Sequence, residues 1–224
     1  MTHTTPKPTA RHITTIVLCT LLGLSGFNHG LFEALQGWTP TPGLVVQAIG
    51  EGQRMWPRGT EEALTVVPNF LITGILAMVA GVAVVVWSIA FIQRKHGALV
   101  LLLLFLILFL VGGGIAQIVF FVTTWAYATR IGKPLRWWSR ILSGPTGARL
   151  ASIWKWSLAA CSLLFLVALE IAIVGYFPGV TDQDSLLAIC WGSLGLSWIL
   201  IHVSFVSGFA RDIAGPTLTA PGNA

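Results

Sequence analysis

Charged residues are scarce in this chain of 224 residues. Asp, Glu, Lys and Arg together make up 9% of the sequence, whereas about a quarter of a soluble globular domain is charged. The mean hydropathy is high, at +0.81. So few charges exclude a soluble globular fold, and the sequence therefore predicts an integral membrane protein that crosses the bilayer several times.

Cysteine is also scarce, and the signatures of the common enzyme classes are missing. Cys19, Cys161 and Cys190 each stand alone in an apolar segment without CxxC spacing, which predicts buried free thiols. The chain contains no HExxH, GxSxG, P-loop or Rossmann signature, so no enzyme class is indicated. Nothing indicates nucleic-acid binding, because membrane topology explains the excess of positive charge.

Long apolar stretches are what the sequence does contain. Five of them reach the roughly 20 residues that a helix needs to cross the hydrocarbon: Ile13–Phe32, Val66–Ile92, Gly97–Thr129, Trp156–Phe177 and Ser185–Ala210. No segment between them is long enough for a separate soluble domain, so residues 1–224 are predicted to form a single all-α transmembrane bundle. The segments expected outside the spans are an N-terminus 1–11, an outer loop 36–65, a basic amphipathic inner loop 130–153 and a C-terminus 212–224. Within the outer loop, Leu44 to Ile49 is expected to lie along the membrane interface.

The longest uncharged segment raises the question of one crossing or two. The 33 residues between His96 and Arg130 carry no formal charge, and as one helix they would be about 50 Å long against a hydrocarbon thickness near 30 Å. Gly112, Gly113 and Gly114 stand in the middle, where glycine weakens a helix and permits the positive φ of a turn. A hairpin at this triplet gives six spans and a straight helix gives five. Since the two halves are short for spans, length alone leaves a near tie.

Basic residues favour the hairpin, because Lys and Arg stay preferentially on the cytoplasmic side. The six-span arrangement places eleven of them inside and two, Arg54 and Arg58, outside, with both termini in the cytoplasm. The five-span arrangement with an outer N-terminus gives nine against four. We therefore predict six spans in the cell (plasma) membrane, with five spans as the alternative.

The inner loop 130–153 combines basic side chains with tryptophans. We expect it to lie on the inner membrane surface as a topological anchor that contacts the headgroups of anionic lipids on the cytoplasmic side. The cationic side chains predicted to make these contacts are Lys133, Arg136, Arg140 and Arg149.

Several polar side chains fall at a similar depth on the outer side of the six-span arrangement. Ionisable groups in spans are costly and are therefore functional candidates. The predicted polar pocket contains His29, Glu33, Asn69, Gln117 and Glu170, with Glu61 and Glu62 above them. Asp182 and Asp184 also lie outside, so the outer mouth is predicted to be acidic and to attract cations.

This residue set allows more than one chemistry. His29, Glu33 and Glu170 are suitable ligands for a divalent metal ion, which is the one cofactor that the sequence suggests. His29 could instead titrate in a proton-coupled site. In the plainer interpretation, His29 and Glu33 pair with each other four residues apart, and Glu170 is protonated and bonds a neighbouring helix.

Three functional hypotheses follow. The first is an outward-facing polar vestibule that binds or passes a cation, a proton or a small solute. The second is a membrane-embedded metal-dependent enzyme with Glu61 or Glu62 as general base. The third is an accessory membrane subunit in which the polar residues only hold helices together. Gly74, Ala77 and Gly81 are spaced for close helix packing under all three, and a second copy or another membrane protein is left open as a partner.

Four segments carry a resemblance to a known family: SGFNHGLFEALQGWTPT, WPRGTEEALTVVPNFLITGILAM, FLVGGGIAQI and LEIAIVGYFPG. Together they cover residues from the first span to the last outer loop, and the chain resembles a family of uncharacterised prokaryotic multi-pass membrane proteins. The resemblance implies an integral membrane protein and no known activity. It supplies no catalytic residues, so the site prediction rests on depth in the bilayer.

Overall fold

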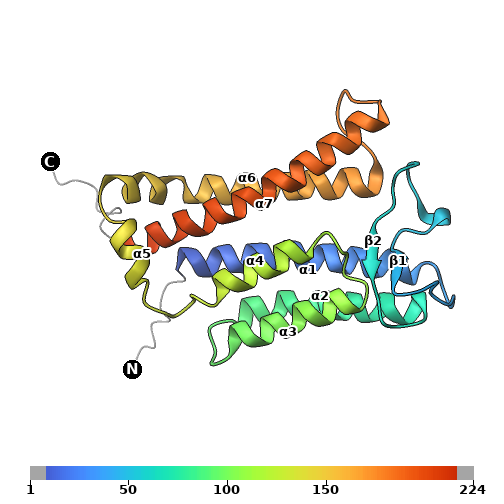
Figure 1. Ribbon diagram of the computed structural model, residues 1–224, viewed down its shortest axis with the longest axis horizontal. Coiled ribbons are helices and arrows are strands. Elements are labelled where there is room, and N and C mark those ends of the chain that lie inside the picture. The colour runs from blue at the N-terminus through green and yellow to red at the C-terminus, as the bar shows by residue number, and fades with distance from the viewer. Residues whose placement is uncertain (1–8, 216–224) are drawn as a thin grey trace.

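The computed structural model describes residues 9–215, which form a bundle of helices with one small sheet (Figure 1). In chain order the elements are α1 Ala10–Ala34, β1 Val45–Gln47, the 3-10 turn η1 Glu51–Gln53, β2 Glu62–Leu64, α2 Phe70–Ala90, α3 Gly97–Leu110, α4 Ile118–Ala128, α5 Arg136–Ile141, α6 Pro145–Val174 and α7 Gln183–Ala214. The two termini named in the predictions, 1–11 and 212–224, fall mostly outside the described residues.

Four helices, α1, α2, α6 and α7, are long and apolar enough to cross a membrane. The prediction of a helical membrane protein is confirmed at this level. The helices α3 and α4 are also apolar but have only 14 and 11 residues, which corresponds to about 21 and 16 Å. Each is shorter than the hydrocarbon core, so the count of six spans stays a prediction.

The chain reverses direction at the glycine triplet. Helix α3 ends at Leu110, and α4 returns beside it, so that the rings of Phe105 and Phe121 stack with centroids 4.6 Å apart. Gly112 and Gly114 have φ of +105° and +86°, which glycine adopts readily. The N–H of Gly112 donates to the carbonyl of Leu64 at 2.9 Å, which attaches the turn to β2.

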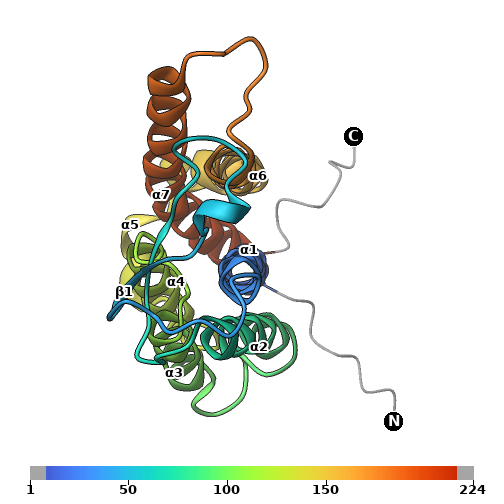
Figure 2. The same ribbon diagram turned by 90° about the vertical axis from the view of Figure 1, so that its right-hand side faces the viewer.

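Helix α1 lies between α2 and the α6–α7 pair and contacts α2, α4, α6 and α7 (Figure 2). It packs most closely on α2, where Gly23 faces Gly81 and Gly30 faces Gly74. A Cβ atom added to Gly30 would lie 2.5 Å from the carbonyl oxygen of Gly74, and one added to Gly81 would lie 2.5 Å from that of Gly23. The small residues therefore let the two backbones touch, as the spacing of Gly74, Ala77 and Gly81 predicts.

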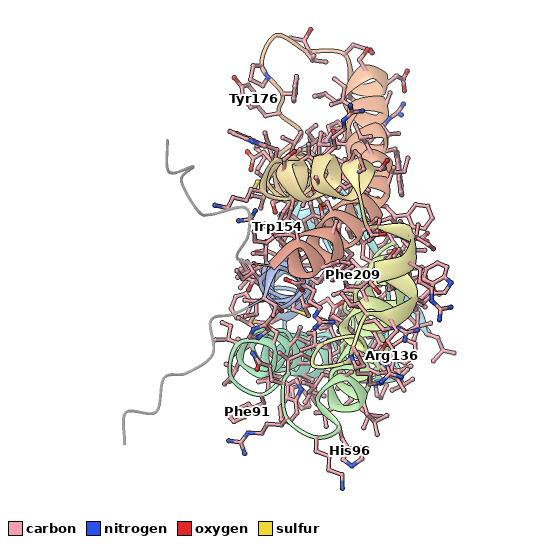
Figure 3. The ribbon with its side chains drawn as sticks, turned by 90° about the vertical axis from the view of Figure 1, so that its left-hand side faces the viewer. Phe91, His96, Arg136, Trp154, Tyr176 and Phe209 are labelled. Carbon is pink, nitrogen blue, oxygen red and sulfur yellow. The ribbon has the colours of Figure 1, made fainter. Side chains whose placement is uncertain are left out.

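The two ends of the bundle carry different elements (Figure 1). One end, here called the basic end, holds the start of α1, the end of α7, α5 and the loop 91–96. Arg11 links three segments at this end. Its Nε lies 3.2 Å from Asp212 Oδ2 on α7, and its Nη1 donates to the carbonyls of Arg130 and Lys133 after α4, both at 2.8 Å. Figure 3 views this end, with Arg136 and His96 at its margin. The other end, the loop end, holds β1, β2, the glycine turn and the connection between α6 and α7.

Two segments contain structure that the sequence did not predict. Val45–Gln47 pairs with Glu62–Leu64 as an antiparallel sheet, because pairing satisfies backbone groups that a bare loop leaves open; that this segment lies along the membrane interface stays a prediction. In the inner loop, α6 already begins at Pro145, eleven residues before the predicted span. Proline suits the first turn of a helix, where its missing N–H is not needed.

Candidate functional site

A cavity of about 880 Å³ opens at the loop end. Helices α1 and α4 border it on one side and α6 and α7 on the other, and residues 48–61, here called the roof loop, lie over it. The polar side chains that line it are Ser25, His29, Arg58, Thr60, Glu61, Glu62 and Gln117. The apolar side chains include Trp56, Phe120, Phe165, Leu169, Leu187, Cys190, Trp191, Leu194 and Trp198.

One wall of this region is a polar stripe on α1 formed by Ser25, His29 and Glu33. These residues are four apart and therefore share one face of the helix. The glycine turn lies along the stripe. A Cβ atom added to Gly114 would lie 2.7 Å from His29 Nε2, and one added to Gly112 would overlap the carboxylate of Glu33. The triplet therefore serves two purposes, since it turns the chain and leaves room for two ionisable side chains.

His29 joins the polar stripe to the roof loop. Its Nε2 contacts Glu61 Oε2, and the pair is ionic when His29 is protonated. Burial acts to raise the pKa of the Glu61 carboxyl, but the charge and hydrogen bond of His29 outweigh it, so this pKa lies below its ordinary value. Glu61 is therefore ionised at neutral pH and holds the roof loop against α1.

Gln117 lies at the start of α4 and contacts the polar stripe of α1. Its Nε2 donates to Ser25 Oγ at 2.7 Å, which links the start of α4 to α1. Its Oε1 is buried and has no hydrogen-bond partner within the described residues, and the same is true of His29 Nδ1. Buried polar atoms without partners are uncommon, so these two atoms are candidates for contact with a bound molecule.

Glu33 is more completely buried than the other residues of the stripe, and it does not line the cavity. Its side chain is fully buried, and neither carboxylate oxygen has a hydrogen-bond partner among residues 9–215. An isolated buried charge is very costly, so Glu33 is expected to be neutral in the folded protein. His29 and Glu33 do not form the predicted pair, because His29 bonds Glu61 instead.

The roof loop is attached to the far side of the cavity as well. Trp56 Nε1 donates to the carbonyl of Ala172 on α6 at 3.2 Å. Arg58 Nη2 lies 2.5 Å from Asp184 Oδ1 at the start of α7. The loop therefore spans the gap between α1 and the α6–α7 pair, with His29–Glu61 on one side and Trp56 and Arg58 on the other.

The structure brings together four of the seven predicted pocket residues, namely His29, Glu61, Glu62 and Gln117. Asn69 instead caps α2, where its side chain accepts from the N–H of Ile72 at 3.2 Å. Glu170 is exposed on α6 and does not line the cavity. Depth along a helix does not fix which face a residue occupies, and the neighbouring Ile171 takes the buried face.

The predicted metal ligands His29, Glu33 and Glu170 are not assembled. Within residues 9–215, no group of three or more His, Cys, Asp and Glu side chains is placed to hold a metal ion. Cys19 and Cys161 are buried free thiols, as predicted, and Cys190 is a partly buried free thiol on the cavity wall.

The aromatic part of the site is absent from the sequence-based prediction. Trp191 and Trp198 lie seven residues apart on one face of α7, and both line the cavity together with Trp56. The seven-residue spacing was a usable signal, because it places two large side chains on the same side of a helix. Trp56 gave no such signal, since its position depends on a contact with α6.

Comparisons with models of protein families, with curated proteins and with solved structures find no match to this chain. The resemblance to a prokaryotic membrane-protein family therefore stays an expectation. The function is argued from the cavity.

Proposed function

We propose that this membrane protein binds a small amphipathic molecule in the cavity at the loop end. The observation that carries the proposal is the division of the cavity into two parts. Phe120, Phe165, Leu169 and Leu194 form apolar walls, while the α1 stripe and the roof loop gather polar groups at one end. A volume of about 880 Å³ lies within the range of roughly 300–1,000 Å³ that is usual for small-molecule sites.

The bilayer is the proposed source of the ligand. Trp191 and Trp198 line the cavity and are 58% and 39% exposed on the outside of α7. In a membrane this surface faces lipid, so the cavity opens sideways between helices. A molecule with an apolar tail can enter there and place its polar group against His29, Glu61 and Gln117, near the level where tryptophans favour the membrane interface.

This proposal keeps the small solute of the sequence-based hypotheses and replaces the bare cation. Within residues 9–215, the polar end does not provide the three or more ligands of a divalent metal site. Transport across the bilayer is not part of the proposal, because below the stripe α1 buries Leu18, Cys19 and Leu22 in the apolar core.

We also propose that the basic end faces the cytoplasm of a plasma-membrane protein, with α3 and α4 as a hairpin. The cationic side chains Lys133, Arg136, Arg140 and Arg149 are exposed there and would contact anionic lipids. Cysteines placed at the exposed Ser143 and Thr181 test this orientation. A membrane-impermeant thiol reagent should label Thr181→Cys in intact cells and Ser143→Cys only after permeabilisation; the reverse pattern would exclude it.

Protection of Cys190 tests the binding proposal. The protein is placed in nanodiscs of zwitterionic lipid and treated with methyl methanethiosulfonate, a small neutral reagent, with Cys190→Ser as the blank. Three probes with the same eight-carbon tail are added separately: octylammonium, octyl glucoside and octyl sulfate. At least one probe is expected to slow modification of Cys190 several-fold.

Gly195 and Gly192 on α7 provide matched variants. A Cβ atom at either position meets open space, but only Gly195 lines the cavity. Gly195→Leu should therefore remove the protection by filling the site, while Gly192→Leu should retain it. Modification of Cys190 at the same rate with and without all three probes would overturn the proposed function.

A further inference from the structure

The polar end of the cavity carries more anionic than cationic groups that are free to meet a ligand. Among residues 9–215, Arg58 is the one Lys or Arg side chain that lines the cavity, and its guanidinium pairs with Asp184 at 2.5 Å. Glu61 has His29 as its partner. Glu62 is exposed at the cavity margin and has no ion-pair partner within the described residues. A positively charged group is therefore the one that this end would attract.

The unpaired Oε1 atom of Gln117 also favours a ligand that donates a hydrogen bond. Because its Nε2 is used by Ser25, the buried Oε1 is left as an acceptor without a donor. A ligand that donates an N–H or O–H group satisfies this atom, whereas a ligand with only acceptors leaves it unpaired.

Two of the three tryptophans that line the cavity, Trp56 and Trp198, offer ring faces instead of donors. Trp56 Nε1 is used by the carbonyl of Ala172, and Trp198 Nε1 by the hydroxyl of Thr123, both at 3.2 Å. With both indole N–H groups bonded elsewhere, the part of each ring that remains for a ligand is its π surface. Indole faces attract cations, and most strongly when water is excluded.

From these three observations we infer that the ligand is a cationic amphipath, with an ammonium head group that carries N–H donors and an aliphatic or aromatic tail. The inference rests on the proposed function, since it names the class of molecule that the same cavity accepts. The head group lies between Gln117 and Glu62, and the tail lies along Phe165 and Leu194. An anionic head group would place its charge beside Glu61 and Glu62.

The three eight-carbon probes also test this inference, because they differ only in the head group. Octylammonium should protect Cys190 at a concentration at least tenfold lower than octyl sulfate does, with octyl glucoside between them. Added salt should weaken protection by octylammonium and leave that by octyl glucoside unchanged, because only the charged head group is screened.

Two carboxylate variants separate the cavity from the general charge of the protein. Glu62→Gln should reduce the advantage of octylammonium over octyl glucoside by about threefold or more. Glu51→Gln removes the same charge from an exposed position in the roof loop that does not line the cavity, and it should leave that advantage unchanged.

The outcomes distinguish the inference from the proposed function. Equal protection by all three probes, or strongest protection by octyl sulfate, would overturn the cationic head group while leaving an amphipath site in place. An equal effect of Glu62→Gln and Glu51→Gln would also overturn it, because the preference would then come from overall charge. No protection by any probe would overturn the proposed function and this inference together.

Discussion

Helix α1 meets its neighbours through two different faces. Toward α2, Gly23 and Gly30 bring the backbones into contact and leave no space between the helices. Toward α6 and α7, the side that carries Ser25 and His29 borders a cavity of about 880 Å³. Helix α1 therefore has one face that is packed tightly on α2, here called the closed face, and one face that borders the cavity, here called the hollow face.

The difference follows from what fills each interface. Glycines spaced seven residues apart on both α1 and α2 repeat one close contact along the two helices. On the hollow face, a loop rather than a helix completes the wall, and the His29–Glu61 contact attaches it to α1. Close packing at α1–α2 fixes the position of α1, so the polar stripe can face a space without losing its alignment.

The largest expected effect comes from adding one methyl group to the closed face. In Gly74→Ala, the new Cβ would overlap the carbonyl of Gly30 and lie 2.5 Å from the N–H of Ala34. Backbone atoms cannot turn away, so we expect a loss of about 3 kcal/mol or more in the free energy of unfolding. Thermal unfolding followed by circular dichroism in detergent measures it.

Gly192→Ala is the control for this substitution, because its Cβ meets open space on α7. It should leave the unfolding temperature nearly unchanged or raise it slightly, since alanine favours the helix. Equal destabilisation by both variants would contradict the close contact between α1 and α2.

The next effect concerns the glycine turn, which packs against the polar stripe at Glu33. Gly112→Ala should cost about 2 kcal/mol, in part because a residue with a Cβ atom is strained at φ +105° and in part because the methyl group overlaps Glu33. In a Glu33→Ala background only the backbone strain should remain, so the cost of Gly112→Ala should fall by about 1 kcal/mol. The wild type, the two single variants and the double variant form a double-mutant cycle measured by thermal unfolding.

Additive effects in this cycle would show that Glu33 and Gly112 do not touch. Gly179→Ala is a useful reference, because this residue also has a positive φ, of +77°, but a Cβ there meets open space. It should show the strain alone, and Glu33→Ala should not change its cost.

The attachment of the roof loop to the rest of the protein should depend on pH. The pKa of Glu61 is lower in the folded protein than its ordinary value, because His29 outweighs the effect of burial. Such a carboxyl stabilises the fold above its unfolded pKa and loses that contribution as the pH falls through the folded value. Protection of residues 48–61 from hydrogen exchange, corrected for intrinsic rates, should therefore persist at neutral pH and be lost below roughly pH 4.

His29→Asn sharpens this prediction. Without the imidazole only the effect of burial remains, so the midpoint of the loss should move to higher pH, and the loop should be less protected at neutral pH, by about 1.5 kcal/mol. An unchanged midpoint would mean that Glu61 is held by something other than His29.

Much of the closed face could be predicted from the sequence. The spacing of Gly74, Ala77 and Gly81 indicates close packing, and it requires only that α2 be a helix. The triplet at Gly112–Gly114 indicates a turn for equally local reasons, since its backbone freedom belongs to the residues themselves. Local chemistry determines these features, so they need no knowledge of the partner segment.

The hollow face could be predicted only in part. The depth argument placed His29 and Gln117 at one level with Glu61 above them, and these three residues line the cavity, but it also included Glu170, which is exposed on α6. Depth does not say which face of α6 carries Glu170, because that depends on how α6 packs against its neighbours. The position of the roof loop depends on Trp56 meeting Ala172, which is 116 residues away, and no local pattern predicts such a contact.

The smallest effect should come from the outer edge of the roof loop, and it tests which side of the loop matters. Arg58 and Asp184 form an ion pair whose side chains are 43% and 77% exposed, and pairs of this kind contribute less than about 1 kcal/mol. Asp184→Asn should therefore raise the rate of Cys190 modification less than twofold, and high salt should erase the difference, since it screens the pair in the native protein. His29→Asn should raise that rate more, and salt should not remove its effect, because the His29–Glu61 contact is shielded from solvent. If Asp184→Asn opened the cavity as much as His29→Asn does, the loop would be held from α7 instead of from α1, and the polar stripe would have no part in closing the hollow face.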